Sequence, residues 1–195
     1  MRDTGGYPVS ITESGSYRLT GDLFVSGTNT SVVVITADDV SLDLNGFTVK
    51  CLFFGTPCAG NGTGVGIDAS SQSNVTIRNG TVRDMAAAAI DLGEGGRVDR
   101  VRAVANGDGN RVLEGEVSSC HSEGNLAAGI TAIDSTVRNS ESRENTVGIQ
   151  CAFSSTRSCK LIGNVITRNG APLSGASTSL GQNLRCDSGG LCTLF

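Results

Sequence analysis

Apolar and polar residues alternate over short stretches of this chain, most clearly between Val40 and Val49. That stretch reads VSLDLNGFTV, so two alternating runs flank Asn45-Gly46. Alternation indicates β-strands with one buried face, and Asn-Gly between two such runs is a strong signal for a β-hairpin. The pattern therefore allows two interpretations: a hairpin, or one corner of a chain that winds on in a single direction.

A repeat of about twenty residues favours continuous winding. Four segments begin with an aliphatic residue and end with Asn after the same interval: 98–106, 117–125, 137–145 and 161–169, with Ile77 extending the series backwards. A second aliphatic series runs beside the first: Ile67, Ile90, Val112, Ile130 and Ile149. One repeat cannot bury its apolar face alone, whereas coils stacked about 4.8 Å apart place like residues above like. The repeats thus predict a parallel β-helix with about three short strands per coil, in which Asn side chains hydrogen-bond along one corner.

A resemblance to a known family supports this prediction. The segments Ile11–Val25 (ITESGSYRLTGDLFV) and Ile35–Val49 (ITADDVSLDLNGFTV) resemble the opening of bacterial right-handed parallel β-helix repeat proteins of the pectate-lyase-like superfamily. The segment 74–82 (NVTIRNGTV) matches the coil pattern of that family, and 180–186 (LGQNLRC) resembles its closing segment. The resemblance implies an all-β, single-stranded right-handed parallel β-helix of roughly 6–8 short coils. Because this superfamily includes lyases, hydrolases, epimerases and adhesins, the resemblance implies a fold rather than one activity.

The ends of such a stack need covering, because they expose unpaired strand edges. We therefore expect one β-helix domain over residues 1–195, with an N-terminal cap at about 1–22 and a C-terminal cap at about 170–195. The C-terminal cap would contain a loop closed by a disulfide.

Six of the seven cysteines fall into close pairs: Cys51 with Cys58, Cys151 with Cys159, and Cys186 with Cys192. No spacing is CxxC and the chain has one His, so a zinc site is not expected. Local disulfides are the favoured interpretation, and reduced, buried thiols are the alternative. Disulfides imply an oxidising compartment, so we expect an extracellular, cell-surface or periplasmic protein.

Composition and charge exclude some classes of partner. The net charge is −4, and the basic residues form no run, so no nucleic acid is expected. No apolar stretch reaches the roughly 20 residues of a membrane span. Aromatic residues make up only 4% of the chain, although Phe53 and Phe54 lie together in the Cys51–Cys58 loop. We expect these two to contact a partner or to fold back over the coil.

Candidate catalytic groups come from stacking the positions that follow the second aliphatic series. These positions are Asp68, Asp91, Leu113, Thr131 and Gln150. Asp68 and Asp91 would lie one coil apart, close enough for acid–base chemistry or for a calcium ion, and Asp43 could join them under a looser alignment. The alternative is that they are solvated turn carboxylates, and no cofactor other than Ca²⁺ is suggested.

His121 falls in a column with Arg102 and Glu141. It is a further catalytic candidate as a general base, or else one member of a surface ladder of mixed charge. Its neighbour Cys120 aligns with Val101 and Ser140, at a position for small side chains. Since adjacent strand residues point to opposite faces, we expect Cys120 to be buried, inert and out of reach of His121.

The predicted column of Asp68 and Asp91 carries no further charged residue after these two coils. This favours a protein without catalytic activity but does not exclude an enzyme. The sequence therefore favours a secreted or cell-surface, non-catalytic β-helix scaffold, structural or adhesive, that can assemble with copies of itself. The alternative is a carbohydrate-active enzyme, a polysaccharide lyase or glycoside hydrolase, or a glycan-binding module, with extracellular polysaccharide as its partner.

Overall fold

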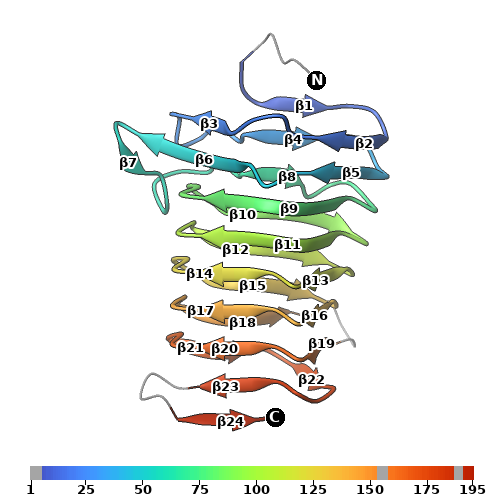
Figure 1. Ribbon diagram of the computed structural model, residues 1–195, viewed down its shortest axis with the longest axis vertical. Coiled ribbons are helices and arrows are strands. Elements are labelled where there is room, and N and C mark those ends of the chain that lie inside the picture. Colours follow the sequence, from blue (N-terminus) through green and yellow to red (C-terminus); the bar gives the residue numbers. More distant parts are fainter. Residues whose placement is uncertain (1–5, 153–157, 187–190) are drawn as a thin grey trace.

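The computed structural model describes residues 6–152, 158–186 and 191–195. In this part of the chain there is no helix, strands make up 56%, and the backbone winds as a right-handed parallel β-helix of about eight coils. Figure 1 shows the coils stacked along the long axis, with the two termini at opposite ends. The predicted fold class is therefore confirmed.

One side of the solenoid is an eight-stranded parallel sheet, called here the first sheet, to which each coil contributes one strand. Its strands, in spatial order, are β1 (Val9–Ile11), β4 (Val33–Ile35), β8 (Ile67–Ala69), β10 (Ala88–Glu94), β12 (Asp108–Leu113), β15 (Ala128–Ile133), β18 (Val147–Ala152) and β21 (Ala171–Ser174).

The second sheet contains 16 strands and forms the remaining walls. β9 (Thr76–Arg83) and β11 (Arg97–Val104) cross both walls, whereas the other coils divide into two short strands. The first strands are β2 (Gly15–Arg18), β5 (Val40–Asp43), β13 (Glu116–Ser118), β16 (Thr136–Arg138), β19 (Cys159–Ile162) and β22 (Ser177–Ser179). The second strands are β3 (Leu23–Val25), β6 (Thr48–Phe53), β14 (His121–Glu123), β17 (Glu141–Arg143), β20 (Val165–Thr167) and β23 (Leu184–Cys186), with β7 (Thr56–Pro57) and β24 (Cys192–Leu194) added to them.

The Asn45-Gly46 turn does not form a hairpin. β5 and β6 do not pair with each other, and both run parallel to β9, with Leu42 opposite Ile77 and Val49 opposite Val82. Both turn residues have positive φ, 54° and 81°, and the N–H of Phe47 donates to the carbonyl oxygen of Leu44 at 2.9 Å. The interpretation as continuous winding is therefore confirmed.

The first aliphatic series stacks as predicted. The register aligns Ile77, Val98, Val117, Val137 and Leu161 on successive coils, and all five are fully buried.

The predicted alignment of the second aliphatic series is wrong at one position. Ile90 and Ile130 align with Asn110, whereas Val112 aligns with Leu92 and Ala132. Residues two apart on a strand face the same way. An alignment that is shifted by two residues therefore keeps the apolar side chains inward, and the hydrophobic pattern does not reveal the error.

A column of small residues precedes the second series: Gly66, Ala89, Gly109, Gly129 and Gly148. A Cβ on Gly129 would overlap Ser142 Oγ and the Nδ2 of Asn145. The backbone of this wall therefore approaches the opposite wall too closely for larger side chains.

An asparagine ladder runs along one corner, as the repeat predicts. Its members are Asn106, Asn125, Asn145 and Asn169, all buried, and each Nδ2 donates to the Oδ1 of the next at 2.8–3.1 Å. The residue before each Asn has positive φ, and this turns the chain through the corner. A shorter ladder at another corner joins Asn164 to Asn183 at 2.9 Å. The side-chain amides thus supply hydrogen bonds where the backbone bends away from the sheet ladders.

At the C-terminal end, β24 runs antiparallel to β23 and Phe195 packs against the core. Residues 9–25 form the three strands of the first coil. Residues 1–5 and 187–190 of the predicted caps lie outside the described residues.

Replacing Asn145 with Leu tests the ladder. The Asn145 side chain bonds Asn125, Ser122, Ser142 and Asn169, so Leu leaves several buried polar groups unsatisfied. We expect a loss of about 2–4 kcal/mol in the free energy of unfolding, measured by urea denaturation. Gln150→Ala, an exposed position in the same coil, is the control and should change stability little. Equal stability of the two variants would contradict the ladder.

Candidate functional site

The outward face of the first sheet carries a polar column in which the sequence prediction is wrong at one residue. The register aligns Asp68, Asp91, Arg111, Thr131 and Gln150, so Arg111 and not Leu113 follows Asp91. This error follows from the Val112 misalignment described above. Arg111 Nη1 lies 3.3 Å from Asp91 Oδ2 and forms an ion pair with it.

Asp68 and Asp91 occupy adjacent coils, and their surroundings differ. The Oδ1 of Asp68 accepts hydrogen bonds from the N–H of Ser70 at 3.1 Å and from its hydroxyl at 2.8 Å. Burial raises the pKa of Asp91, Arg111 opposes the rise, and the nearby charges of Asp68 and Asp108 add to it. In the described residues no three His, Cys, Asp or Glu side chains are arranged to hold a metal ion. A catalytic or calcium role for the pair stays a prediction.

Asp43 does not join this column. It lies on β5 in the second sheet, with Arg78 Nε at 3.4 Å and Arg18 Nη2 at 4.0 Å. Burial alone would raise its pKa, but the hydrogen bonds from Asn45 and Asn79 and the two arginines bring it below the ordinary value. The looser alignment was wrong because β5 pairs with β2 and β9, not with the strands that carry Asp68 and Asp91.

His121 lies on the second sheet, in the predicted column with Arg102 and Glu141. Its Nδ1 is 3.1 Å from Glu141 Oε2, and its Nε2 is 3.0 Å from Glu123 Oε2. Arg143 Nη2 donates to the other oxygen of Glu123 at 2.8 Å. His121, Glu123, Glu141 and Arg143 therefore form one mutually paired cluster.

Sequence reasoning missed Glu123 and Arg143. Each lies two residues after a member of the predicted column, on the same strand face. The alternation alone could have identified them. Both ring nitrogens of His121 face a carboxylate, which is compatible with a surface ladder of mixed charge. A general-base role for His121 stays a prediction.

Cys120 is buried, and its neighbours in the register are Val101 and Ser140, as expected. Burial raises the pKa of its thiol to about 12. The Sγ is directed to the backbone carbonyls of Ser118 and Val98, on the opposite face from His121. A nucleophilic role for this thiol is therefore not supported.

The three predicted disulfides are present: Cys51–Cys58, Cys151–Cys159 and Cys186–Cys192. The first closes a hairpin made by β6 and β7, the second joins β18 to β19, and the third joins β23 to β24.

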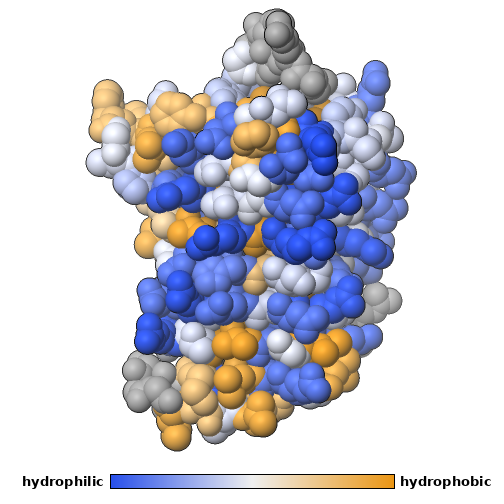
Figure 2. All heavy atoms as spheres, in the orientation of Figure 1, coloured by the Kyte–Doolittle hydropathy of each residue, from blue (hydrophilic) through white to orange (hydrophobic). Residues whose placement is uncertain are grey.

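The hairpin closed by Cys51 and Cys58 projects from the side of the solenoid, near its N-terminal end (Figure 1). Phe54 is 91% exposed and Phe53 is 42% exposed, and their ring centroids lie 4.4 Å apart. Figure 2 shows apolar residues gathered on this projection, above a mainly hydrophilic face. Of the two expectations for these residues, folding back over the coil is therefore wrong.

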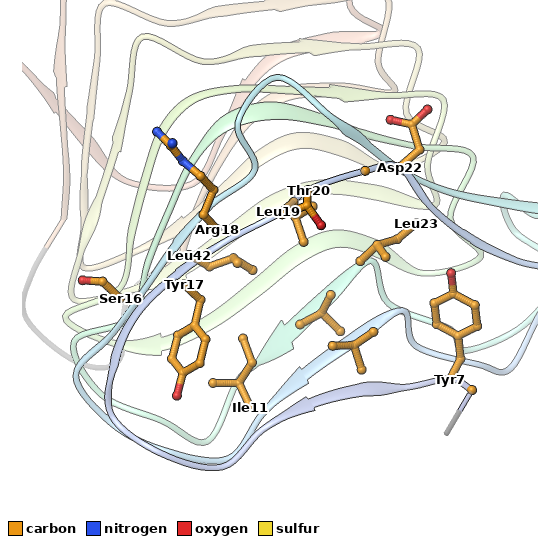
Figure 3. Close-up of a pocket in the computed structure, with 14 residues that line it drawn as sticks. Tyr7, Ile11, Ser16, Tyr17, Arg18, Leu19, Thr20, Asp22, Leu23 and Leu42 are labelled. Atoms are coloured by element: carbon orange, nitrogen blue, oxygen red, sulfur yellow. The ribbon is translucent and has the colours of Figure 1, made fainter. Parts of the chain in front are cut away.

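A hollow of about 500 Å³ opens at the N-terminal end of the solenoid. Ile11, Tyr17, Leu19 and Leu23 of the first coil form its apolar walls, and Leu42 of the second coil belongs to its floor. Figure 3 shows Arg18 and Asp22 pointing away from its centre. The hollow is thus the exposed end of the core, and in the described residues its lining is mainly apolar.

The chain matches no protein-family model and no curated protein. A membrane-spanning helix is absent from the described residues.

Thiol labelling tests the cysteine assignments. Because the Cys120 thiol is buried with a pKa of about 12, the folded protein should incorporate no iodoacetamide at pH 8 without reductant. In denaturant it should incorporate one label, since the other six cysteines are disulfide-bonded. Mass spectrometry counts the labels. Rapid labelling of the folded chain, or three or more labels in denaturant, would contradict the assignment.

Acid titration tests the His121 cluster. Hydrogen bonds from His121 and Arg143 lower the pKa of Glu123 in the folded protein. This pairing therefore stabilises the fold above the carboxyl's unfolded pKa, and the contribution is lost as the pH falls through the lowered folded value. Glu123→Gln should be less stable at pH 7 by up to about 1 kcal/mol, and the deficit should vanish toward acid. Urea denaturation between pH 7 and 3 measures it, with the exposed Glu94→Gln as the control. A deficit that is independent of pH would refute the charge contribution.

Proposed function

We propose that this protein is a secreted or cell-surface scaffold without catalytic activity, related to the bacterial right-handed β-helix repeat proteins of the pectate-lyase-like superfamily. The observation that carries the proposal is the pairing of its surface charges. The candidate groups His121 and Asp91 are each engaged by neighbouring charged side chains on the flat faces of the solenoid. Such ladders stabilise a rod and offer no unpaired acid or base to a substrate.

The disulfides and the continuous core support a role outside the cytoplasm. A local disulfide contributes about 2–3 kcal/mol by the loop-entropy estimate, and three of them suit a chain that must persist in an oxidising compartment. The rod would act structurally or adhesively, by holding its projecting segments at fixed spacing. Assembly with copies of itself belongs to this proposal, and concentration-dependent light scattering tests it.

A specific observation also favours a second function, binding or cleavage of an extracellular polysaccharide. Asp91 combines a raised pKa with an adjacent cation, Arg111, on an outward strand face. A carboxyl that keeps its proton longer than usual is suited to general acid chemistry. In the same column Thr131 and Gln150 could hydrogen-bond sugar hydroxyls.

An activity assay separates the two functions. The purified chain is incubated with neutral and acidic polysaccharides, with and without calcium, and reducing ends and unsaturated products are measured. We expect no product and no difference between the native chain and Asp91→Asn. Product that the native chain and the exposed-site control Glu94→Gln release, but Asp91→Asn does not, would establish the enzyme and overturn the scaffold proposal.

A further inference from the structure

The hairpin formed by β6 and β7 is not needed to continue the solenoid. β6 pairs with β9 only through Thr48, Val49 and Lys50, and its last residues extend beyond the wall. β7 then pairs back on it, with Phe53 opposite Thr56. The disulfide at its base and the hydrogen bond from Thr56 Oγ1 to the carbonyl of Phe53, at 2.7 Å, fix its shape.

The tip of this hairpin presents an aromatic residue in a conformation that aromatics rarely adopt. Phe54 and Gly55 both have positive φ, 48° and 80°, as in a type I′ turn, for which Asn-Gly is the favoured sequence. Fourteen other non-glycine residues have positive φ in the described part of the chain, and none of them is aromatic. Asn at position 54 would suit the backbone better, so the phenyl ring is not explained by the turn itself.

Chemically the hairpin has an uncharged tip and a cationic base. Residues 51–58, CLFFGTPC, contain no charged side chain and three consecutive large apolar residues. Lys50 and Arg83 are directly opposite each other on β6 and β9, and two like charges in this position repel. The Nζ of Lys50 lies 5.9 Å from the ring centroid of the half-exposed Phe24, and Arg83 also pairs with Asp84.

We propose that this hairpin binds the interfacial region of a phospholipid bilayer. Phe53 and Phe54 enter the boundary of the acyl chains, and Lys50 and Arg83 lie beside the lipid phosphates. Phe53 lies three positions beyond Lys50 along the strand, a rise of about 10 Å, which matches the depth of about 5–10 Å that interfacial segments reach. A bilayer is favoured over an apolar protein pocket because its phosphates complement the cationic base of the hairpin while its acyl chains cover the uncharged tip. The proposal does not depend on whether the chain is an enzyme.

Vesicle flotation of the full chain tests the proposal, with phosphatidylcholine vesicles and with vesicles that also contain phosphatidylglycerol. The native protein should float with both, and more strongly with the anionic vesicles at low salt. Phe54→Asn should bind at least about tenfold more weakly, because it removes one large apolar contact. Its urea midpoint should be unchanged or higher, since Asn tolerates positive φ. Lys50→Gln should reduce the advantage of the anionic vesicles, since only Arg83 then remains at the base, and it should leave binding to phosphatidylcholine unchanged.

The matched control is Leu180→Asn, which removes another exposed apolar side chain at the opposite end of the rod. It should float like the native protein. The proposal is overturned if the native protein does not float, if Phe54→Asn floats as well as the native protein, or if the control loses binding equally. It is also overturned if native copies associate without vesicles and Phe54→Asn abolishes that association, because the hairpin would then contact another copy.

Discussion

The axial hydrogen bonding between stacked coils is the constraint on which the rest of the structure depends. Every coil must place its strands about 4.8 Å from those of the next coil, on three walls at once. The chain can do so only if it bends sharply at each corner, and positive φ recurs there at residues such as Asp84, Ala105 and Glu144. At a bend the sheet ladder is interrupted, and the side-chain oxygens of Asn145 and Asn169 accept hydrogen bonds from the backbone N–H groups of Asn125 and Asn145. Alternating strands, corner residues and Asn ladders are thus consequences of one geometric requirement.

This requirement also explains how much the sequence could predict. The coil spacing revealed the first aliphatic series and the Asn corner, because each recurs in at least four successive coils. The same logic failed at Val112, since a shift of two residues leaves the inward face unchanged and only the length of the preceding turn fixes the register. The outward column could not be completed without that register, so Arg111 was missed. Glu123 and Arg143 were missed for another reason. Each column was followed from coil to coil, and the next outward position along the same strand was not considered.

The same misread coil buries polar groups that lack hydrogen-bond partners in the described residues. Asn110 replaces an isoleucine between Ile90 and Ile130, and in the described residues neither amide atom of its side chain has a hydrogen-bond partner. The hydroxyl of Ser122, in the same coil, is also buried without a partner. Each such group costs about 1–3 kcal/mol. Since the stability of a solenoid is approximately a sum over neighbouring repeats, these groups lower the contribution of this coil to the stability of the stack.

Two hairpins depart from parallel winding in the described residues, and each is closed by a disulfide. The hairpin of β23 and β24, with Cys186–Cys192, has a clear structural role because it leads to Phe195, which packs against the last coil of the core. The hairpin of β6 and β7 buries its disulfide, Cys51–Cys58, against the core, but its tip leaves Phe54 in solvent. Phe54 is 91% exposed in a backbone conformation that is costly for an aromatic residue, so burial in the solenoid does not explain its presence. The proposed contact with a bilayer would explain it. In that proposal the rod would hold the contact at a fixed position.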